Sequence, residues 1–509
     1  WTTAASSYNV GIGSKVLDSA LNGASNNTAI GYYALSAVTT ADNNVALGSN
    51  SLGALTTGSG NIAIGESAMY VHTTGSNNIA IGIGAMDDTN AGATSLGSGD
   101  NVFIGAYSGS GTWADAASNN NIGIGSNVMA DALNGALDNI AVGDNALNDL
   151  TSGDSNVAIG SNALDELTTG GNNVAIGKNS IQQNTGVSNV VAIGHESMGG
   201  VNNTNGIQSV VAIGRNALYG AAGTSTGVNG SIAIGRGSLE VLTTGVGNTA
   251  VGYNTLIAQV DGGQNTALGY EALLTENSGN FSTAIGYQAL KVQDAAGTSG
   301  NTAVGNQAGL AISSGNQCTL VGYLAGDGIT TGANNTGLGA SVAFDVDANN
   351  QTALGHGATT DSANDIAIGN TSVDEVKGQV DFSVFSDKRI KKDIIDGDLG
   401  LDFINELKVR KFKKVNPAKY PNSIRKQNDG RDRDGNEFEW TDAQSNKVWD
   451  GLIAQEVKEA MDKSGTTFSG WSEESNSKQL VTYSTMVMPL IKAVQELSAE
   501  VKQLKKQLE

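Results

Sequence analysis

Ser386 and Lys391 are the residues of this 509-residue chain whose types and spacing best suit covalent chemistry. A serine hydroxyl becomes a nucleophile when a base takes its proton, and a lysine serves as that base only when burial lowers its pKa towards neutrality. Serine–lysine pairs are a known variant of the catalytic triad. On residue types alone, however, a turn capped by Ser386 beside a solvated basic face is the favoured interpretation. The basic residues of that face are Lys388, Arg389, Lys391 and Lys392.

The pair lies where the composition of the chain changes abruptly. Residues 1–385 contain 6 Lys/Arg and 28 Asp/Glu, a net charge of −22, whereas residues 386–509 contain 22 and 21, a net charge of +1. All 3 prolines and only 7 of the 69 glycines fall in the second part. Two different kinds of structure therefore meet near residue 385. The acidic first part would repel nucleic acid, so we expect no nucleic-acid partner.

Several classes of protein are excluded by composition. The single cysteine, Cys318, permits neither a disulfide framework nor a cysteine-rich zinc site. Glycine is abundant but has no Gly-X-Y period, which excludes collagen. No run of 18 apolar residues is present, so we expect no membrane insertion. The chain begins at Trp1 without a basic-then-apolar leader, and we interpret it as an excerpt in which any targeting segment is missing.

A short phrase is repeated through most of the first part. An Asn pair or Asn-Thr precedes an apolar residue, alanine, a second apolar residue and a closing glycine, as in 61–65, 78–82 and 173–177. The closing glycine, here called the marker glycine, occurs in 21 copies, most often 17 residues apart. Many copies carry a second phrase about four residues later, such as Asn-Ala-Leu at 145–147, followed by a Leu-Thr-Thr-Gly turn.

A unit this small cannot bury a core alone, so a fixed period of this size predicts stacked coils, each covering its neighbour. The pattern predicts a mainly β fold: a long β-solenoid with two short strands per coil, joined by Gly, Asn and Thr turns. Asparagines in successive coils are expected to stack as a hydrogen-bonded ladder. With strands ~4.8 Å apart, 21 coils would form a rod on the order of 100 Å long. We place this shaft at residues 1–372 and a junction at 373–385.

The repeated phrase resembles the left-handed β-roll heads of trimeric autotransporter adhesins. The resemblance covers most of residues 9–372. It implies that three chains wind together, with the small residues of each coil permitting their close approach.

The second part contains ordered blocks at 385–394, 400–407, 409–413, 451–457 and 481–484. Their order and spacing resemble the C-terminal intramolecular chaperone of phage endosialidases, which is also found on other phage tail fibres and tailspikes. The resemblance covers residues 386–509, a small α+β domain, and implies that this domain promotes homotrimerisation and then cuts itself off. With this resemblance, a catalytic serine–lysine pair is favoured over a capped turn beside a solvated basic face.

The resemblance assigns the cut to the bond between Phe385 and Ser386, with Ser386 and Lys391 as the catalytic pair. Ser386 would attack the Phe385 carbonyl and form an ester that water hydrolyses; a water attack assisted by the same residues stays open. An enzyme acting on any external substrate is not expected, and neither is a cofactor or a metal.

The last segment, 484–509, is predicted to form a coiled coil. Val487, Leu490, Val494, Leu497, Val501, Leu504 and Leu508 alternate steps of three and four. β-Branched residues at one core position with leucine at the other favour dimers in isolated coils. The resemblance implies a trimer, and we follow it.

Other candidate sites are weaker. His72, His195 and His356 are interpreted as exposed loop positions rather than metal ligands. Residues 429–435 look superficially like a calcium loop but lack two of its carboxylates, so a polar hairpin is favoured. Tyrosines that follow marker glycines, such as Tyr253 and Tyr270, would line up along the rod, where packing is favoured over stacking against sugars.

Two classes of function follow from these resemblances. The favoured one is a receptor-binding tail fibre of a bacteriophage, located on the virion, which would bind a host-cell surface glycan or protein and attach to other tail proteins through its missing N-terminal part. The alternatives are a trimeric adhesin on a bacterial surface and a polysaccharide-binding solenoid. An adhesin would end in a membrane anchor of apolar strands, whereas this chain ends in Lys-Lys-Gln-Leu-Glu, which favours the fibre. Loops of irregular length, 83–102 and 195–211, are expected to contact the receptor.

Overall fold

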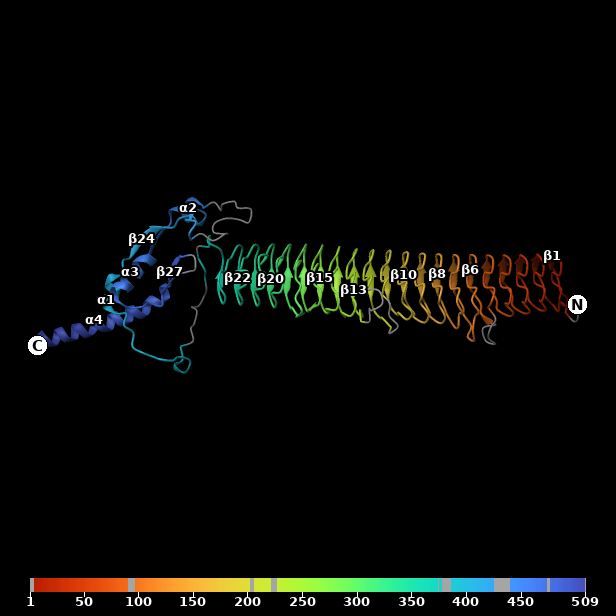
Figure 1. The fold of residues 1–509 in the computed structure, drawn as a ribbon, viewed down its shortest axis with the longest axis horizontal. Helices are drawn as coiled ribbons and strands as arrows, with labels where there is room; N and C mark the ends of the chain where they lie inside the picture. Colours follow the sequence, from red (N-terminus) through yellow and green to blue (C-terminus); the bar gives the residue numbers. More distant parts are fainter. Residues whose placement is uncertain are drawn as a thin grey trace. The chain divides into compact units, whose positions relative to one another are not determined.

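The computed structural model divides the chain into two compact units, Trp1–Ile368 and Gly369–Glu509, which are described separately (Figure 1). The structure describes residues 4–89, 97–201, 206–220, 227–373, 375–377, 386–424, 440–473 and 477–508. The predicted architecture, a mainly β solenoid followed by a small unit ending in a helix, is confirmed.

The first unit is a parallel β-solenoid in which one sheet of 21 strands runs along the rod. Each strand has three residues and pairs in register with the corresponding strand of the next coil, as β4 and β5 do. The strands are β1 (Val10–Ile12), β2 (Thr28–Ile30), β3 (Val45–Leu47), β4 (Ile62–Ile64), β5 (Ile79–Ile81), β6 (Val102–Ile104), β7 (Ile122–Ile124), β8 (Ile140–Val142), β9 (Val157–Ile159), β10 (Val174–Ile176), β11 (Val191–Ile193), β12 (Val211–Ile213), β13 (Ile232–Ile234), β14 (Thr249–Val251), β15 (Thr266–Leu268), β17 (Thr283–Ile285), β19 (Thr302–Val304), β20 (Thr319–Val321), β21 (Thr336–Leu338), β22 (Thr352–Leu354) and β23 (Ile366–Ile368). Two further strands, β16 (Gly279–Asn280) and β18 (Gly297–Thr298), pair with each other.

Alternation of side chains along each strand places the middle residue inside the coil. In β4, Ala63 is fully buried while Ile62 and Ile64 face outward and stay partly exposed. Because the coil is narrow, the inner position is usually alanine. Phe103 is an exception, and its partner across the sheet is Gly123. A Cβ at residue 123 would lie 2.5 Å from a Phe103 ring carbon, so the large side chain is accommodated by the absence of one next to it.

The second phrase of each coil does not form the predicted second strand. Asn145 and Leu147 have φ angles of 54° and 52°, in the left-handed region, with Ala146 between them. Their backbone still bonds from coil to coil: the Leu147 N–H donates to the Ala163 carbonyl at 3.0 Å. Asparagine tolerates this conformation, and leucine, unbranched at Cβ, is strained less by it than valine or isoleucine. The prediction of two strands per coil was therefore wrong, because a short apolar phrase suits either conformation.

The predicted asparagine ladder is confirmed. Its longest run is fully buried and consists of Asn27, Asn44, Asn61, Asn78, Asn101, Asn121, Asn139, Asn156 and Asn173. Asn44 shows the repeating pattern: its Nδ2 donates to Asn27 Oδ1 at 3.1 Å and to the Gly58 carbonyl at 3.0 Å. Its backbone N–H also donates to Asn27 Oδ1, at 3.0 Å. The ladder therefore satisfies backbone groups that would otherwise be buried without partners.

The marker glycines are required by both backbone angle and space. Gly65 has a φ of +139°, and a Cβ added there would lie 2.2 Å from the Gly82 carbonyl oxygen of the next coil. Neither a side chain nor a shift of that carbonyl is compatible with the pairing of β4 and β5. The same close approach recurs along the rod, which explains why this position keeps glycine.

The second unit is a small α+β arrangement whose core contains Phe403, Val457, Ala460, Met461, Phe468 and Met486. Its α-helices are α1 (Leu401–Glu406), α2 (Asp442–Asn446), α3 (Ala454–Ser464) and α4 (Val487–Leu508). Its 3-10 helices are η2 (Lys388–Ile390), η3 (Pro417–Lys419) and η4 (Tyr483–Met486). Two antiparallel pairs complete it: β24 (Arg410–Lys413) with β25 (Val448–Gly451), and β26 (Trp471–Glu473) with β27 (Gln479–Val481).

Candidate functional site

Ser386 and Lys391 lie on either side of the 3-10 helix η2, which brings their side chains together. The Lys391 Nζ donates to the Ser386 Oγ at 2.7 Å. Asp387 caps the helix by accepting from the Arg389 backbone N–H at 2.8 Å. The Arg389 guanidinium also contacts this carboxylate, at 2.6 Å, and lowers the pKa of Asp387. Because Asp387 is engaged by Arg389, the Lys391 amine is left to contact the serine.

Both members of the pair are exposed in the single chain. A lysine acts as a general base only after burial has removed the water that stabilises its charged form. The described residues of one chain provide no such cover. Phe385, whose carbonyl the sequence analysis assigned as the target, lies outside the described residues, as do residues 429–435 of the calcium-like segment.

The other sequence blocks meet in the second unit. The Leu401 N–H, at the start of α1, donates to Glu496 Oε2 of α4 at 2.7 Å. A Cβ at Gly400 would lie 2.1 Å from the same oxygen, so a side chain there would displace the Glu496 carboxylate from this position. The block at 400–407 therefore anchors the long C-terminal helix.

A second contact joins the blocks at 451–457 and 481–484. The Leu452 N–H donates to the Tyr483 hydroxyl at 2.8 Å, and a Cβ at Gly451 would lie 2.4 Å from that hydroxyl. Arg410 of β24 pairs with Glu456 of α3 at 2.6 Å, and this contact lowers the pKa of Glu456. These contacts fix α3 and α4 around the small core.

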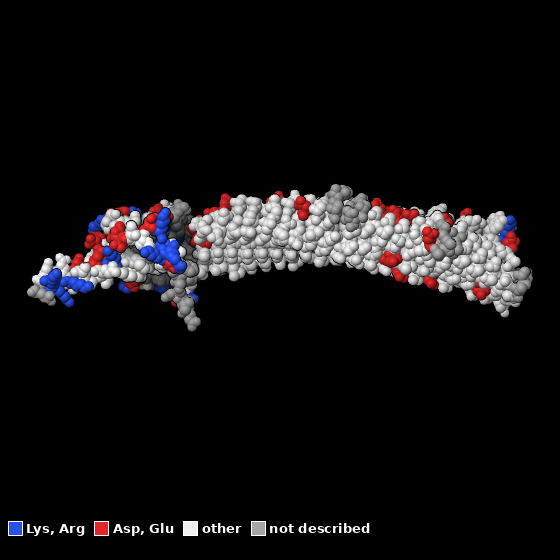
Figure 2. Space-filling model, turned by 90° about the horizontal axis from the view of Figure 1, so that it is seen from below, with Lys and Arg blue, Asp and Glu red and all other residues white. Residues whose placement is uncertain are grey.

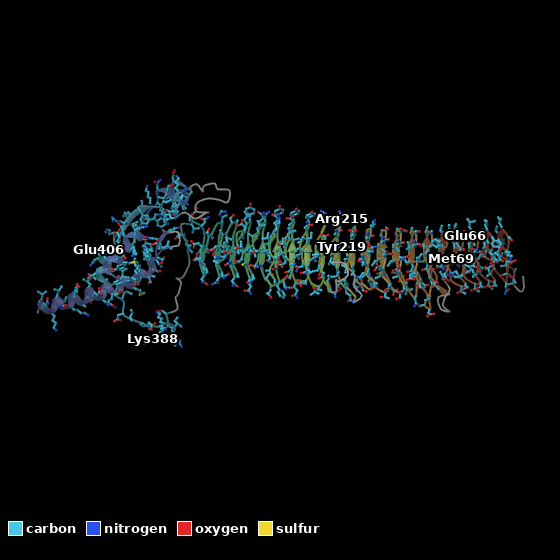
Figure 3. All side chains as sticks on the ribbon, in the orientation of Figure 1. Glu66, Met69, Arg215, Tyr219, Lys388 and Glu406 are labelled. Carbon is cyan, nitrogen blue, oxygen red and sulfur yellow. The ribbon has the colours of Figure 1, made fainter. Side chains whose placement is uncertain are left out.

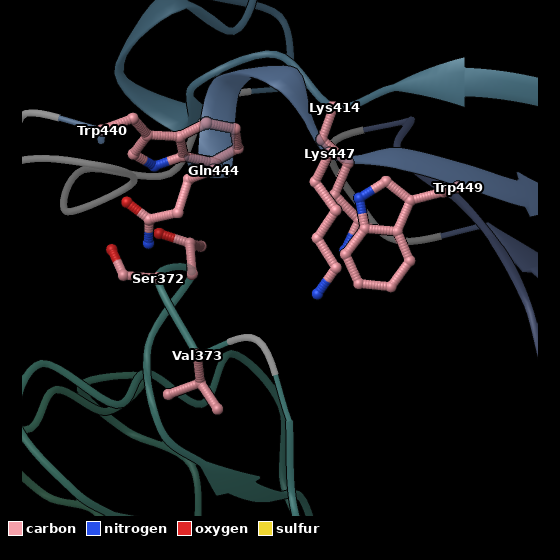
Figure 4. A pocket seen from close by; sticks show the side chains of 8 residues that line it. Ser372, Val373, Lys414, Trp440, Gln444, Lys447 and Trp449 are labelled. Atoms are coloured by element: carbon pink, nitrogen blue, oxygen red, sulfur yellow. The ribbon is translucent and has the colours of Figure 1, made fainter. Parts of the chain in front are cut away.

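A cluster of tryptophan and lysine side chains lies near α2 (Figure 4). The ammonium groups of Lys414 and Lys447 each lie 4.2 Å from the centre of the Trp449 ring, within the range of cation–π attraction. The Trp440 Nε1 is buried without a hydrogen-bond partner. The sequence analysis did not identify this cluster, because its members are spread over more than 30 residues.

The helix predicted to form a coiled coil begins as η4 and becomes α-helical at Val487. The seven apolar positions of its heptad pattern, here called the α4 stripe, are all exposed in the single chain. Their exposed fractions run from 42% for Val501 to 88% for Leu508. An apolar row this regular on a helix is a surface that normally faces another helix.

The three histidines do not share one environment. His195 and His356 are exposed, as expected, but His72 is buried, so its interpretation as an exposed loop residue was wrong. Its Nδ1 lies 2.8 Å from the Thr89 hydroxyl, and burial lowers its pKa to about 4. No group of His, Cys, Asp or Glu able to hold a metal ion occurs among the residues that the structure describes.

Three of the tyrosines that follow marker glycines stack on one another. The ring centres of Tyr253 and Tyr270 are 5.2 Å apart, and those of Tyr270 and Tyr287 are 5.3 Å apart, with nearly parallel planes. Both faces of Tyr270 and one face each of Tyr253 and Tyr287 are therefore occupied within the stack. The favoured interpretation of packing along the rod is confirmed for this group.

Comparison with known proteins agrees with the blocks of the second unit. Residues 386–466 match the family model described as the chaperone of endosialidase. A search of the curated proteins found no match for the chain. In the parts of the chain that the structure describes, no helix has the length and apolar character needed to cross a membrane. The match begins at Ser386 and includes Lys391, α1 and α3. The C-terminal part of this chain is thus similar to the chaperone of endosialidase over residues 386–466, and it follows a parallel β-solenoid.

Proposed function

We propose that this chain is a homotrimeric shaft of a bacteriophage tail fibre, assembled by its C-terminal unit and then freed of it by self-cleavage before Ser386. The observation that carries the proposal is the amount of apolar surface that one chain leaves uncovered in both units. Chaperone-of-endosialidase domains are associated with trimerisation, which fits three copies covering one another.

The outward face of the solenoid sheet is apolar along its length. The third residue of every sheet strand is Ile, Val or Leu, and several are well exposed, including Leu47, Leu268 and Leu338 at 44%, 46% and 55%. The first residue is mostly Val or Ile up to β13 and threonine in every sheet strand from β14 to β22. A continuous apolar face of this kind marks an interaction surface. Three rods facing inward would bury it.

The threonine column also bears on the alternative of a polysaccharide-binding solenoid. A flat binding face of that type needs paired threonines in each strand. Here each threonine is followed two residues later by an apolar residue, as in Thr266 and Leu268 of β15. This pattern favours a role in packing between chains rather than a regular threonine surface that binds polysaccharide.

Uncovered apolar residues surround the serine–lysine pair as well. Ile390, Ile394 and Ile395 are 66%, 61% and 88% exposed. Burying them against a neighbouring chain would remove water from the adjacent Lys391 amine and favour its neutral form. Trimerisation would thus create the base that the single chain lacks. An unassembled chain would keep its lysine solvated, which delays the cut until assembly.

The proposed cleavage needs no reagent other than water. Lys391 accepts the Ser386 hydroxyl proton while the Oγ bonds to the Phe385 carbonyl carbon. The peptide C–N bond then breaks, the amine of Ser386 takes the proton, and an ester remains. Water hydrolyses the ester to a carboxylate on Phe385 and restores the hydroxyl. Direct attack by water, with Lys391 as its base, would give the same products without the ester.

The experiment compares the wild type with Ser386→Ala, Lys391→Ala and the neighbouring control Lys392→Ala. Native mass should correspond to a trimer in all four. On denaturing gels with intact-mass analysis, the wild type and the control should release a 124-residue fragment (509 minus 385). Both pair variants should retain the full 51.7 kDa chain. A native monomer or dimer would overturn the fibre model, and a cut persisting in Ser386→Ala would overturn the assignment.

Hydroxylamine distinguishes the two routes, because it traps an ester as a hydroxamate on Phe385. Location is tested separately with antibodies raised against the solenoid. Labelling of tail structures on virions is the expected outcome, whereas labelling of bacterial envelopes would support the adhesin alternative.

A further inference from the structure

Positive charge in the solenoid is concentrated at one position of the coil. Residues 1–385 contain only 6 Lys/Arg, and three of them, Lys178, Arg215 and Arg236, directly follow a marker glycine. His195 occupies the same position in the coil between the first two. These four residues, here called the basic stripe, come from four consecutive coils, those of β10, β11, β12 and β13.

Backbone hydrogen bonds hold the basic stripe in register. The Glu196 N–H donates to the Lys178 carbonyl at 3.0 Å, and the Asn216 N–H donates to the His195 carbonyl at 3.1 Å. The same bond continues at 3.0 Å from the Gly237 N–H to the Arg215 carbonyl. Consecutive side chains are therefore spaced by the distance between neighbouring strands, roughly 4.8 Å.

The basic stripe is exposed and largely without counter-charge. All four side chains are exposed. No salt bridge reaches Lys178, Arg215 or Arg236 within the described residues, and His195 contacts Glu196 at 3.5 Å. Lys291, in contrast, is paired with Glu271 at 2.8 Å. Lys178, Arg215 and Arg236 carry like charges on neighbouring coils, so binding of an external anion would relieve their repulsion.

The basic stripe lies on one edge of the rod. Figure 3 labels Arg215 on the upper edge of the solenoid, where Glu66, at the same coil position, is also labelled. The opposite face, seen from below in Figure 2, has no blue over the middle of the solenoid. The stripe is therefore a local feature on an otherwise acidic rod.

The stacked tyrosines continue this column directly. Arg236 donates to the Tyr253 hydroxyl at 2.9 Å, and its guanidinium carbon lies 5.4 Å from the centre of that ring. Tyr270 and Tyr287 follow in the next coils. The Tyr270 hydroxyl bonds to Glu271, and a hydroxyl oxygen or hydrogen not used in these contacts can bond to a sugar hydroxyl.

We propose that the basic stripe binds a linear polysaccharide that carries carboxylates. An arginine fork matches a carboxylate in two places, and a straight row of cations suits a chain with charges at regular intervals. The tyrosine edges then contact sugar hydroxyls beyond the charged segment. Nucleic acid fits less well, because most of the tyrosine faces are occupied within the stack and the rest of the solenoid is strongly acidic. This proposal deepens the fibre model by naming the class of host glycan.

The test uses the assembled full-length protein and fluorescein-labelled polygalacturonate, with neutral dextran and single-stranded DNA as comparison ligands. Lys178→Gln, Arg215→Gln and Arg236→Gln are combined in one variant. Lys15→Gln, Lys291→Gln and Lys377→Gln form a control with the same loss of charge elsewhere. Polarisation titrations are run at several salt concentrations, after native mass has established the trimer.

We expect salt-sensitive binding of polygalacturonate by the wild type and the control, and at least tenfold weaker binding by the stripe variant. Equal loss in both variants would reduce the effect to net charge and overturn the proposal. Tighter binding of DNA than of polygalacturonate would overturn it in favour of nucleic acid. If the wild-type trimer binds none of the ligands, the polysaccharide proposal is refuted and the trimeric fibre model is not. If the stripe variant fails to form a trimer, the stripe is a contact between chains and the proposal is overturned.

Discussion

Each coil of the solenoid buries its alanine and leucine side chains against the next coil, whereas the C-terminal unit has a small core and an exposed α4 stripe. The rod thus finds most of its packing partners within its own chain. The apolar stripe of the longest helix of the C-terminal unit stays exposed in the single chain. Under the proposed function, the repeat would supply length and rigidity, and the non-repeating unit would select partner chains.

The repeat also creates a problem that the C-terminal unit is suited to solve. Successive coils are so similar that three chains could pair in many offsets, each nearly as favourable as the correct one. The C-terminal unit does not repeat, and contacts such as Leu401 with Glu496 and Leu452 with Tyr483 hold its own chain in one arrangement. Joining the chains at this end first would set the register for every coil that follows.

The largest effect is expected from the α4 stripe. Replacing Leu490, Leu497 and Leu504 together by alanine should abolish trimer formation, because each truncation of a buried leucine costs about 2–5 kcal/mol. Native mass and yield of trimer measure the result. Lys502→Ala, Gln503→Ala and Lys506→Ala combined, at exposed positions of α4 away from the stripe, should leave assembly normal. Normal trimer from the leucine variant would remove the proposed division of tasks.

A substitution at a marker glycine should damage the rod and spare the C-terminal unit. Gly65→Ala forces a Cβ to within 2.2 Å of a carbonyl oxygen at a φ of +139°, so we expect a loss of about 2–5 kcal/mol in that coil. Hydrogen exchange of peptides covering β3 to β5 should become faster. Gly328→Ala is the control, since no atom lies within 4 Å of its Cβ position. Equal exchange in both variants would contradict the close approach.

His72 makes the stability of one coil depend on pH. Burial lowers its folded pKa to about 4, so between pH 6.5 and 4 the unfolded chain binds a proton that the folded chain does not. Stability should be complete above pH 6.5 and fall by up to about 3 kcal/mol as the pH drops to 4. Exchange around residue 72 at pH 7.5 and 4.5, corrected for intrinsic rates, measures this. His72→Gln should remove the dependence, and the exposed His195→Gln should retain it.

The smallest effect is expected within the asparagine ladder. Asn156→Ala removes the bonds to Asn139 and to the Gly170 carbonyl, leaving buried groups unpaired at a cost of about 2 kcal/mol. Asn148→Ala, at a partly buried position outside the ladder, should have little effect. Thermal unfolding of the trimer compares the two. A melting temperature unchanged in Asn156→Ala would show that the ladder adds no stability.

Much of the fold was accessible from the sequence because its signals are periodic. The repeat of alanine between two branched residues specified strands such as β4, and the in-register asparagines implied the ladder. The second phrase was misassigned because Asn145 and Leu147 alternate in a way that suits a strand equally well. His72 was misplaced because the periodicity of the backbone does not reveal which loop residues turn inward.

The serine–lysine pair was identified only through the order of the blocks around it. Residue types alone favoured a capped turn, and the contact of 2.7 Å between Lys391 and Ser386 is compatible with both interpretations. The property that would distinguish them is burial of the lysine, which we propose arises only when chains assemble. No single-chain pattern contains it.

Because one coil runs from each marker glycine to the next, the length of the rod can change by whole coils. Each strand pairs residue for residue with the equivalent strand of the next coil, and the extra residues of the longer coils lie outside the strands. Duplicating or deleting one whole repeat would recreate all contacts at the new boundary, whereas a change of a few residues within a strand would shift the pattern onto the wrong face. Recombination between near-identical repeats can therefore lengthen or shorten the rod by whole coils. The length of the rod can vary in this way while the contacts between coils stay the same.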